Sequence, residues 1–365
     1  MSIGIKSPGK YVQGKGELKN LGKNVKKLGN KFLVLCSPNN IIRIGKVIED
    51  SLNEVEKEYV FLPFSGECSK AEISRIMEAV EENACDAIIG AGGGKAIDAA
   101  KAAAENLGGL PTIVIPKLAS NDAPCSGVAV IYNEEGVVIK ALITRRNPDL
   151  VLVDTDIIAK SPRRLLAAGM GDALATWFEA RACRNSGARN MARGTCSNTA
   201  FMMAKLCYDM LLRDGVKALE AADNKEATPE LENIVEANIY LSGVGWESGG
   251  LAAAHAVNDG LAYVPQAHGM YHGEKVAFGT LVQLVLEKAH KEEMDEVLSF
   301  MKATGLPMTL SDLGITDVKE EEIKKAAEAA CVPTQSTKNL RSDITAEEMF
   351  EAIVEADKIG TAYKN

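Results

Sequence analysis

The chain has 365 residues, a length that corresponds to about two domains, and its hydrophobic fraction of 46% argues against disorder. The net charge of −9 disfavours nucleic acid as the main partner, because phosphate binding needs a basic face. The sequence has neither an apolar run of about 18 residues nor a signal-peptide core, so we expect no membrane partner and a cytoplasmic protein. None of the eight cysteines forms a C-x-x-C pair, so we expect reduced structural thiols.

The first part of the chain alternates between short apolar runs and helical patterns. The predicted strands are "KFLVLCS" (31–37), "YVFLPF" (59–64), "DAIIGAG" (86–92), "TIVIP" (112–116) and "DLVLVDTDII" (149–158). Helical patterns fill 41–57, 69–83 and 95–106, and "GVAVIYN" with "VVIKALI" flank "EEG" as a predicted hairpin. Strand–helix alternation with apolar strands predicts a Rossmann-like parallel sheet that is covered on both faces.

The period becomes helical at "SPRRLLAAG", where Ser161 is the expected N-cap and Pro162 the first helical residue. Helical patterns then continue to the end of the chain. Breaks are predicted near 185–187, Gly215, Pro229, 265–269, 305–307 and 331–342. We therefore expect an α/β domain over 1–160 and an all-helical domain over 161–365, with a ligand in the cleft between them.

A glycine-rich turn, "GAGGGKAIDAAK" (90–101), follows the third predicted strand and opens a helix. It departs from G-x-G-x-x-G, because position 95 is Lys, and from the Walker A loop, because position 89 is Ile. Gly92, Gly93 and Gly94 still allow close approach to the backbone, and a helix start favours an anion. The turn therefore favours a phosphate or pyrophosphate over a plain strand–helix connection.

Four polar side chains stand out in the helical part. "HGMYHGEKVAFG" (268–279) holds His268 and His272 four residues apart, but the surrounding glycines predict a loop, so helical spacing does not pair them. His255 lies in a Gly- and Ala-rich helix, where a lone histidine is more often a satisfied core residue. Asp172 lies in the almost wholly apolar "AAGMGDALATWFEA" and must meet a cation, a metal or several donors. One aspartate and two histidines with open coordination positions suit catalytic Zn²⁺ or Fe²⁺.

Four segments carry a specific resemblance: "GMGDALATWFEARAC", "AAAHAVNDGLAYVPQAHGMYHGEKVAFG", "ASNDAPCSG" and "GAGGGKAIDAAK". They resemble the glycerol dehydrogenases of the iron-containing (group III) alcohol dehydrogenase superfamily, and "TGLPMTLSDLGI" (303–314) extends the match along the chain. The resemblance implies a nicotinamide-dinucleotide-binding α/β domain and a helical domain that carries zinc. It also implies a small polyol substrate, such as glycerol or a related 1,2-diol, and a homo-oligomer, which is an octamer in several members.

The resemblance also implies roles for single residues. Asp172, His255 and His272 would bind the metal, and Asp122 would bind substrate hydroxyls. The iron-using branch has a further histidine where this chain has Thr176, so three ligands and zinc are favoured. The residues expected near the cofactor are Ser37, Gly92, Gly93, Gly94, Lys95, Asp98, Lys117, Ser120, Ser126, Val128 and Tyr132.

Cofactor choice is less determined than the metal ligands. NAD-preferring relatives carry an aspartate where this chain has Ser37, and threonines where it has Ala96 and Lys117. Loss of that carboxylate removes a repulsion of the 2′-phosphate, so NAD is expected and NADP is possible. The alternative is that the Ser37 hydroxyl hydrogen-bonds the adenosine ribose of the cofactor and that Lys117 lies along the protein surface.

Other functions of the same fold remain as alternatives. A dehydroquinate synthase-like lyase or a glycerol-1-phosphate dehydrogenase needs cations near the metal, yet 120–132 and 251–273 contain no Lys or Arg. A small 2-hydroxy acid is a further candidate substrate. A non-catalytic binding protein is disfavoured, because all three expected metal ligands are present.

Overall fold

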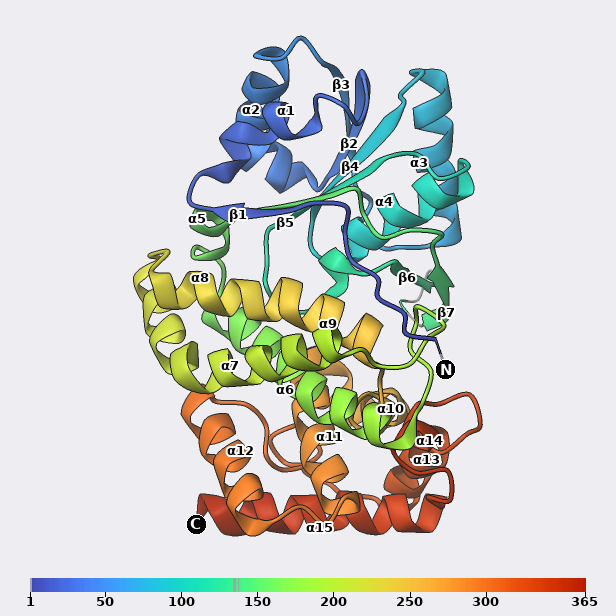
Figure 1. The fold of residues 1–365 in the computed structure, drawn as a ribbon, viewed down its shortest axis with the longest axis vertical. Helices are drawn as coiled ribbons and strands as arrows, with labels where there is room; N and C mark the ends of the chain where they lie inside the picture. Colours follow the sequence, from blue (N-terminus) through green and yellow to red (C-terminus); the bar gives the residue numbers. More distant parts are fainter. Residues whose placement is uncertain (1, 134–135, 137) are drawn as a thin grey trace.

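The computed structural model describes residues 2–133, 136 and 138–365. A six-stranded parallel sheet forms the first half, with strand order β1-β8-β5-β4-β2-β3. Its strands are β1 (Tyr11–Gly14), β2 (Lys31–Cys36), β3 (Glu58–Pro63), β4 (Ala87–Gly92), β5 (Thr112–Pro116) and β8 (Leu150–Asp154). Figure 1 shows this sheet at one end of the molecule and the helices of the second half at the other.

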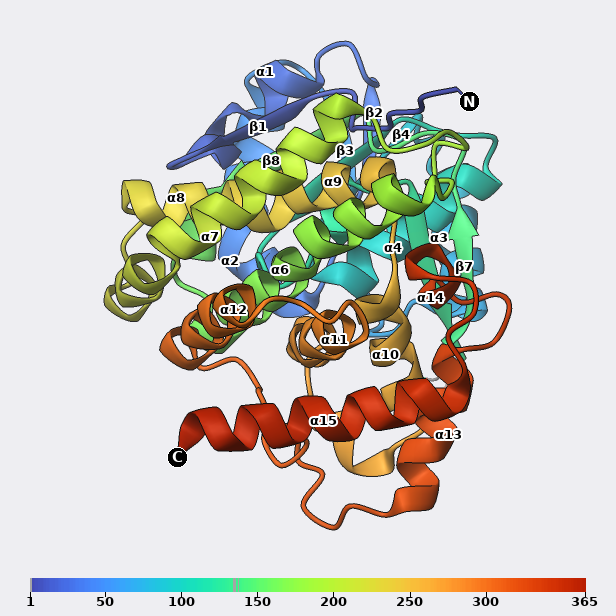
Figure 2. The same cartoon turned by 60° about the horizontal axis from the view of Figure 1, so that its bottom comes forward.

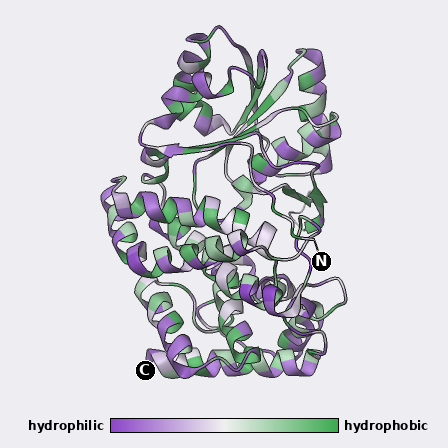
Figure 3. Cartoon of the chain, viewed as in Figure 1, coloured by the Kyte–Doolittle hydropathy of each residue, from purple (hydrophilic) through white to green (hydrophobic). Residues whose placement is uncertain are grey.

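Both faces of the sheet are buried, as the apolar strands predict. Phe32, Val34 and Cys36 of β2 belong to the core under α1 (Leu21–Val25) and α2 (Pro38–Asn53). The alternate residues Leu33 and Leu35 belong to the core under α3 (Lys70–Glu82) and α4 (Gly94–Asn106). In Figure 3 the central strands of the sheet are correspondingly hydrophobic along most of their length. This period of two follows from the pleat of the strand.

The predicted hairpin is present as β6 (Val128–Tyr132) paired antiparallel with β7 (Val138–Ile143). The predicted turn includes residues 134 and 135, and the second predicted strand includes residue 137; these three lie outside the described residues. A short 3₁₀ turn, η2 (Ala123–Cys125), precedes the hairpin.

The second half is helical, as predicted. Its longer helices are α6 (Arg163–Ser186), α7 (Asn198–Asn224), α8 (Pro229–Glu236), α9 (Ser242–Gly249), α10 (Ala253–Leu261), α11 (His272–Leu286), α12 (Lys291–Thr304), α13 (Glu320–Ala330) and α15 (Ala346–Lys364). Its short helices are the π-helix η3 (Ala237–Leu241), the 3₁₀ helix η4 (Pro265–Gly269) and α14 (Thr337–Leu340), while the short helices η1 (Glu17–Asn20) and α5 (Thr155–Ile158) belong to the first half. α6 packs against α7, α9 and α11, and α15 lies at the end far from the sheet (Figures 1 and 2). Among the described residues, no helix has the length and apolarity that crossing a bilayer requires.

Three details of the predicted helices and strands are wrong. The strand predicted over 149–158 ends at Asp154, whose side chain accepts from the Asp156 amide and starts α5. Ser161 is not the N-cap of α6, because the helix begins at Arg163 and Pro162 is its N-cap; the Ser161 amide donates to the Ile158 carbonyl in the turn after α5. Gly215 does not break its helix.

Gly215 lies inside α7 and serves packing. A Cβ there would stand 2.9 Å from the Phe300 ring, so glycine allows this helix to approach α12. The edge strand β1 was not predicted, since its four residues, "YVQG", carry little apolar signal.

Candidate functional site

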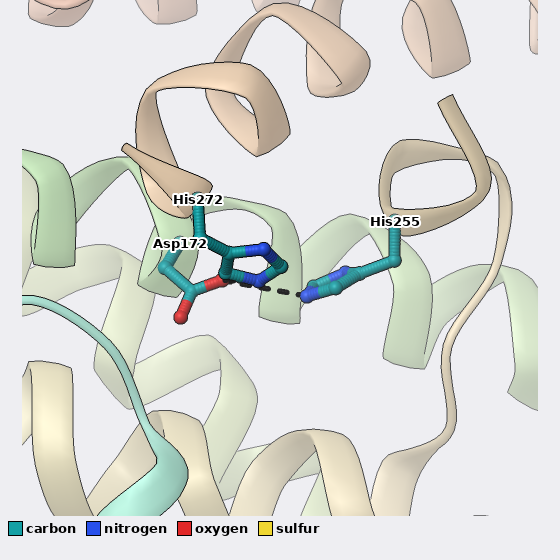
Figure 4. A group of neighbouring side chains, drawn as sticks. All are labelled: Asp172, His255 and His272. Atoms are coloured by element: carbon teal, nitrogen blue, oxygen red, sulfur yellow. Dashed lines mark ion pairs between the residues drawn. The ribbon is translucent and has the colours of Figure 1, made fainter. Parts of the chain in front are cut away.

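Asp172, His255 and His272 come together from three helices, α6, α10 and α11. Nε2 of His255 lies 3.4 Å and Nε2 of His272 lies 3.2 Å from the same oxygen, Oδ1 of Asp172. Figure 4 shows both imidazole rings directed at this carboxylate. Asp172 is 1% exposed, whereas the His272 side chain is 43% exposed. The carboxylate of the cluster is therefore buried, and solvent reaches the cluster on the side of His272.

Glycines beside two of these residues let the helices meet. A Cβ on Gly171 would stand 2.4 Å from the Gly273 carbonyl oxygen, and a Cβ on Gly273 would stand 1.8 Å from the Ala168 carbonyl oxygen. Any larger residue would separate α6 from α11. The sequence thus brings Asp172 and His272 together by placing a glycine next to each.

Glu179 orients His255. This fully buried carboxylate lies 2.6 Å from Nδ1 of His255 through Oε2, and its Oε1 accepts the backbone amides of Ala252 and His255 at 2.9 and 3.0 Å. An acceptor at Nδ1 keeps the proton on that nitrogen and leaves the Nε2 lone pair free. Glu179 therefore holds the ring in the tautomer that a metal ligand needs.

His272 is fixed through the start of α11. Glu274 accepts the Tyr271 amide at 2.8 Å in a capping box, and Arg164 of α6 donates to both oxygens of Glu274 at 2.6 and 2.9 Å. Because Arg164 and Asp172 share one helix, this ion pair ties the helix that carries the aspartate to the turn that carries His272.

The electrostatics fit a cation at this point. Burial alone would raise the pKa of Asp172, but the two histidines outweigh it and hold that pKa well below its ordinary value. Burial would lower the pKa of His255, yet Glu179 and Asp172 raise it well above the usual range. Both oxygens of Asp172 are buried, and neither has a hydrogen-bond partner among the described residues. A buried carboxylate without donors is costly unless a charge compensates it.

The spacing also fits a metal ion. The three ligand atoms lie within 4.8 Å of one another. Atoms bound at about 2.0–2.1 Å to a tetrahedral Zn²⁺ stand roughly 3.3–3.4 Å apart, close to the 3.2 and 3.4 Å between Asp172 Oδ1 and the two imidazole nitrogens. Three protein ligands leave a position open, which is the arrangement of catalytic zinc sites.

Asp122 lies on the loop between β5 and η2, and it is 9% exposed. Its Oδ2 accepts the Ser242 hydroxyl at 3.0 Å, and Ser242 lies 2.9 Å from the Thr176 hydroxyl. Burial, with the nearby Asp172 carboxylate, raises the pKa of Asp122 well above its ordinary value. The second carboxylate thus stands near the metal cluster on a different element.

The glycine turn and Ser37 meet at one edge of the sheet. Gly92 ends β4 beside Pro116 of β5, and Ser37 follows β2, the neighbour of β4 on the other side. The chain order reverses between β2 and β4, and parallel sheets bind ligands outside the carboxyl ends at such a switch point. Gly93 and Gly94 lie at the start of α4, where Cβ atoms would meet nothing closer than 3.4 Å.

Lys117 and Ser37 lie at this same edge. Lys117 follows β5, and its Nζ donates to Asn40 of α2 at 3.0 Å. Ser37 is the N-cap of α2, and within the described residues it makes no side-chain capping hydrogen bond. Ser120 lies on the loop from Lys117 to Asp122.

The remaining predicted cofactor residues surround α4 and the hairpin. Lys95 is half-exposed, bonds Glu67 at 2.5 Å and lies 4.9 Å from the Tyr132 ring centroid. Asp98 is buried, where it accepts the Val130 amide at 3.0 Å. This contact ties α4 to strand β6 of the hairpin.

Lys101, which the sequence did not single out, holds the chain around two further predicted residues. Its ammonium lies 2.9 Å from Asp98 and donates to the carbonyls of Ser126 and Val128. The Ser126 hydroxyl in turn donates to the Ala123 carbonyl at 3.3 Å.

His268 stands apart from the cluster. It lies in η4, where a loop was predicted, and its Nε2 is 2.9 Å from the Ala262 carbonyl oxygen. His272 begins the following helix, so the two histidines do not share one helical face.

Comparison with known proteins identifies a matching family model and relatives that are similar over almost the whole chain. The family model for iron-containing alcohol dehydrogenase matches residues 8–155. A glycerol dehydrogenase from Escherichia coli O6:H1 is 47% identical over 359 residues, 98% of each chain. One from Pseudomonas putida is 48% identical over 360 residues, 99% of this chain and 98% of that protein. This chain belongs to the glycerol dehydrogenase family. The crystal structure of glycerol dehydrogenase from Schizosaccharomyces pombe matches with a TM-score of 0.95 at 36% identity, over 100% of this chain and 92% of that one.

Membership of the glycerol dehydrogenase family confirms the resemblance, the predicted fold class and the assignment to metal-dependent oxidoreductases. Sequence reasoning missed the partners that orient the site, Glu179 and Ser242. Glu179 left a signal, since it is the second carboxylate in the apolar segment of Asp172. No sequence pattern marks Ser242, because serines are common in helical segments.

Proposed function

We propose that this protein is a zinc-dependent dehydrogenase that transfers a hydride between NAD and a small 1,2-diol, with glycerol and dihydroxyacetone as the leading pair. The observation that carries the proposal is the buried, donor-free carboxylate of Asp172 facing two imidazole nitrogens at 3.2 and 3.4 Å. The similarity to glycerol dehydrogenases over almost the whole chain supports the substrate class.

In this proposal Asp172, His255 and His272 hold the metal, and Asp122 orients a substrate hydroxyl. Bound Zn²⁺ supplies Lewis-acid chemistry that makes an alcohol hydroxyl easier to deprotonate near neutral pH. Glu179 keeps His255 in the ligating tautomer. Zinc is preferred to iron because Thr176, where the iron-using branch has a further histidine, bonds Ser242 instead.

The cofactor would lie along the sheet edge between β2 and β4. The glycine turn (92–94) would take the pyrophosphate on the backbone amides that begin α4, and the Ser37 hydroxyl would meet the adenosine ribose. Lys117, a cation at the same edge, supports acceptance of NADP beside NAD, since among the described residues its ammonium donates to the neutral Asn40. The other residues expected near the cofactor would complete its site from α4, the loops on either side of η2 and the hairpin strand β6; they are Lys95, Asp98, Ser120, Ser126, Val128 and Tyr132.

An initial-rate screen tests the proposal. The substrates are glycerol, 1,2-propanediol, 2,3-butanediol, small 2-hydroxy acids and glycerol 1-phosphate, each with NAD⁺ and NADP⁺, and Asp172→Asn is the matched control. We expect diol oxidation by the native protein and none by the variant. A clear preference for the phosphorylated polyol or for a hydroxy acid would replace the diol assignment.

Cytoplasmic location, a homo-oligomer and a domain boundary near residue 160 remain predictions.

A further inference from the structure

We infer that Ser242 is a positioning residue that holds the Asp122 carboxylate for a substrate hydroxyl, and that Thr176 fixes the direction of the Ser242 hydroxyl. The inference rests on the proposed function, because it concerns how Asp122 serves a diol. It assigns a role to two hydroxyl groups that bind no metal and lie outside the predicted site residues.

The hydrogen-bond chain has one consistent direction. Ser242 and Thr176 are fully buried, so neither hydroxyl can turn to solvent. A serine hydroxyl has a single hydrogen, and Ser242 donates it to Oδ2 of the carboxylate at 3.0 Å. The Ser242 oxygen must then accept from Thr176, 2.9 Å away. Thr176 therefore supplies the hydrogen bond that keeps the Ser242 proton on Asp122.

The helix that carries Ser242 also holds the backbone of the Asp122 loop. Asn238 of the π-helix η3 donates to the Ala119 carbonyl at 2.9 Å. A Cβ on Gly243 would stand 3.0 Å from the Asp122 carbonyl oxygen, so glycine lets α9 rest directly on the loop. π-Helical turns such as η3 occur often at functional sites. Three neighbouring contacts thus set both the loop and its carboxylate.

Fixing one oxygen of a carboxylate defines where the other points. With Oδ2 of Asp122 bound to Ser242, rotation of the side chain is restrained, and Oδ1 remains as the acceptor for a substrate hydroxyl. In the proposed function, a substrate with two neighbouring hydroxyls would present one to the metal and the other to this oxygen. A monoalcohol has no second hydroxyl for Asp122 to hold. The position of Ser242 therefore bears on the preference for diols.

Ser242→Ala tests the inference directly. We expect kcat/KM for a 1,2-diol to fall about tenfold or more, as expected when a buried carboxyl oxygen loses its hydrogen-bond donor, with bound zinc unchanged. For 1-propanol the fall should be no more than about twofold. Thr176→Val, which keeps the side-chain shape, should give a smaller fall on the diol. The matched control is Thr280→Val, because Thr280 is equally buried but donates only to the Val276 carbonyl of its own helix.

A double-mutant cycle separates positioning from general damage. If Ser242 acts through Asp122, then Ser242→Ala should cost nothing further in an Asp122→Ala background. Additive losses, or equal losses on diol and monoalcohol, would overturn the inference. If Asp122→Ala itself leaves diol oxidation intact, the proposed role of Asp122 fails instead. Zinc content and melting temperature show whether each variant is folded.

Discussion

Replacing Glu179 by glutamine tests how the candidate metal centre is held. Glu179 accepts at both oxygens: Oε1 takes two backbone amides and Oε2 takes Nδ1 of His255. Glutamine has nearly the same shape, but one of its two terminal atoms is an NH₂ donor. If its oxygen meets the amides, its NH₂ faces Nδ1, which must then accept and leave the proton on Nε2. That tautomer blocks the atom expected to bind the metal.

The change of the His255 tautomer determines the expected loss of metal affinity. Loss of a hydrogen-bonding partner behind a metal ligand weakens metal affinity about 10–100-fold, or ~1.4–2.8 kcal/mol. Affinity is measured by competition with a fluorescent zinc chelator on metal-free protein. Glu293→Gln is the control, because this carboxylate bonds Arg181 at 2.5 Å and does not touch the cluster. Equal affinity in Glu179→Gln and native protein would refute the tautomer argument.

The other variants probe single assignments. His268→Ala should keep zinc and appreciable activity, whereas His255→Ala should lose both; equal zinc loss would reverse the histidine assignment. Ser37→Asp should lower kcat/KM for NADP⁺ at least about tenfold, ~1.4 kcal/mol, with little change for NAD⁺. A native enzyme that already rejects NADP⁺ that strongly would sink this reading of Ser37. Burial raises the pKa of Cys36 to about 11, so peptide mass spectrometry after alkylation at pH 8 should find Cys36 intact and the partly exposed Cys331 modified; rapid Cys36 labelling would contradict its burial.

The sheet was predictable because its strands are apolar on both faces and its helices repeat between them. β1 escaped prediction, because an edge strand of four residues gains its place from pairing with β8 rather than from its own pattern. The helix break predicted at Gly215 was wrong for a related reason. Local propensity reads a glycine as a break, whereas contact with the Phe300 ring makes it a packing residue.

The candidate site was predictable in part. Burial of Asp172 in an apolar helix follows from its own segment, and this alone demands a compensating charge. Its partners were reached only through family resemblance, because His255 and His272 belong to other helices. The contact between Glu179 and His255 spans 76 residues, and no periodic pattern records it. The Ser242–Asp122 contact spans 120 residues and was missed entirely.

The measurement that tests the metal centre most directly is elemental analysis combined with chelation and reconstitution. We expect about one zinc per chain, because one three-ligand catalytic site binds one ion. Stripping the metal should abolish diol oxidation and lower the melting temperature, and adding Zn²⁺ should restore both. A metal-free preparation with full activity would contradict the account.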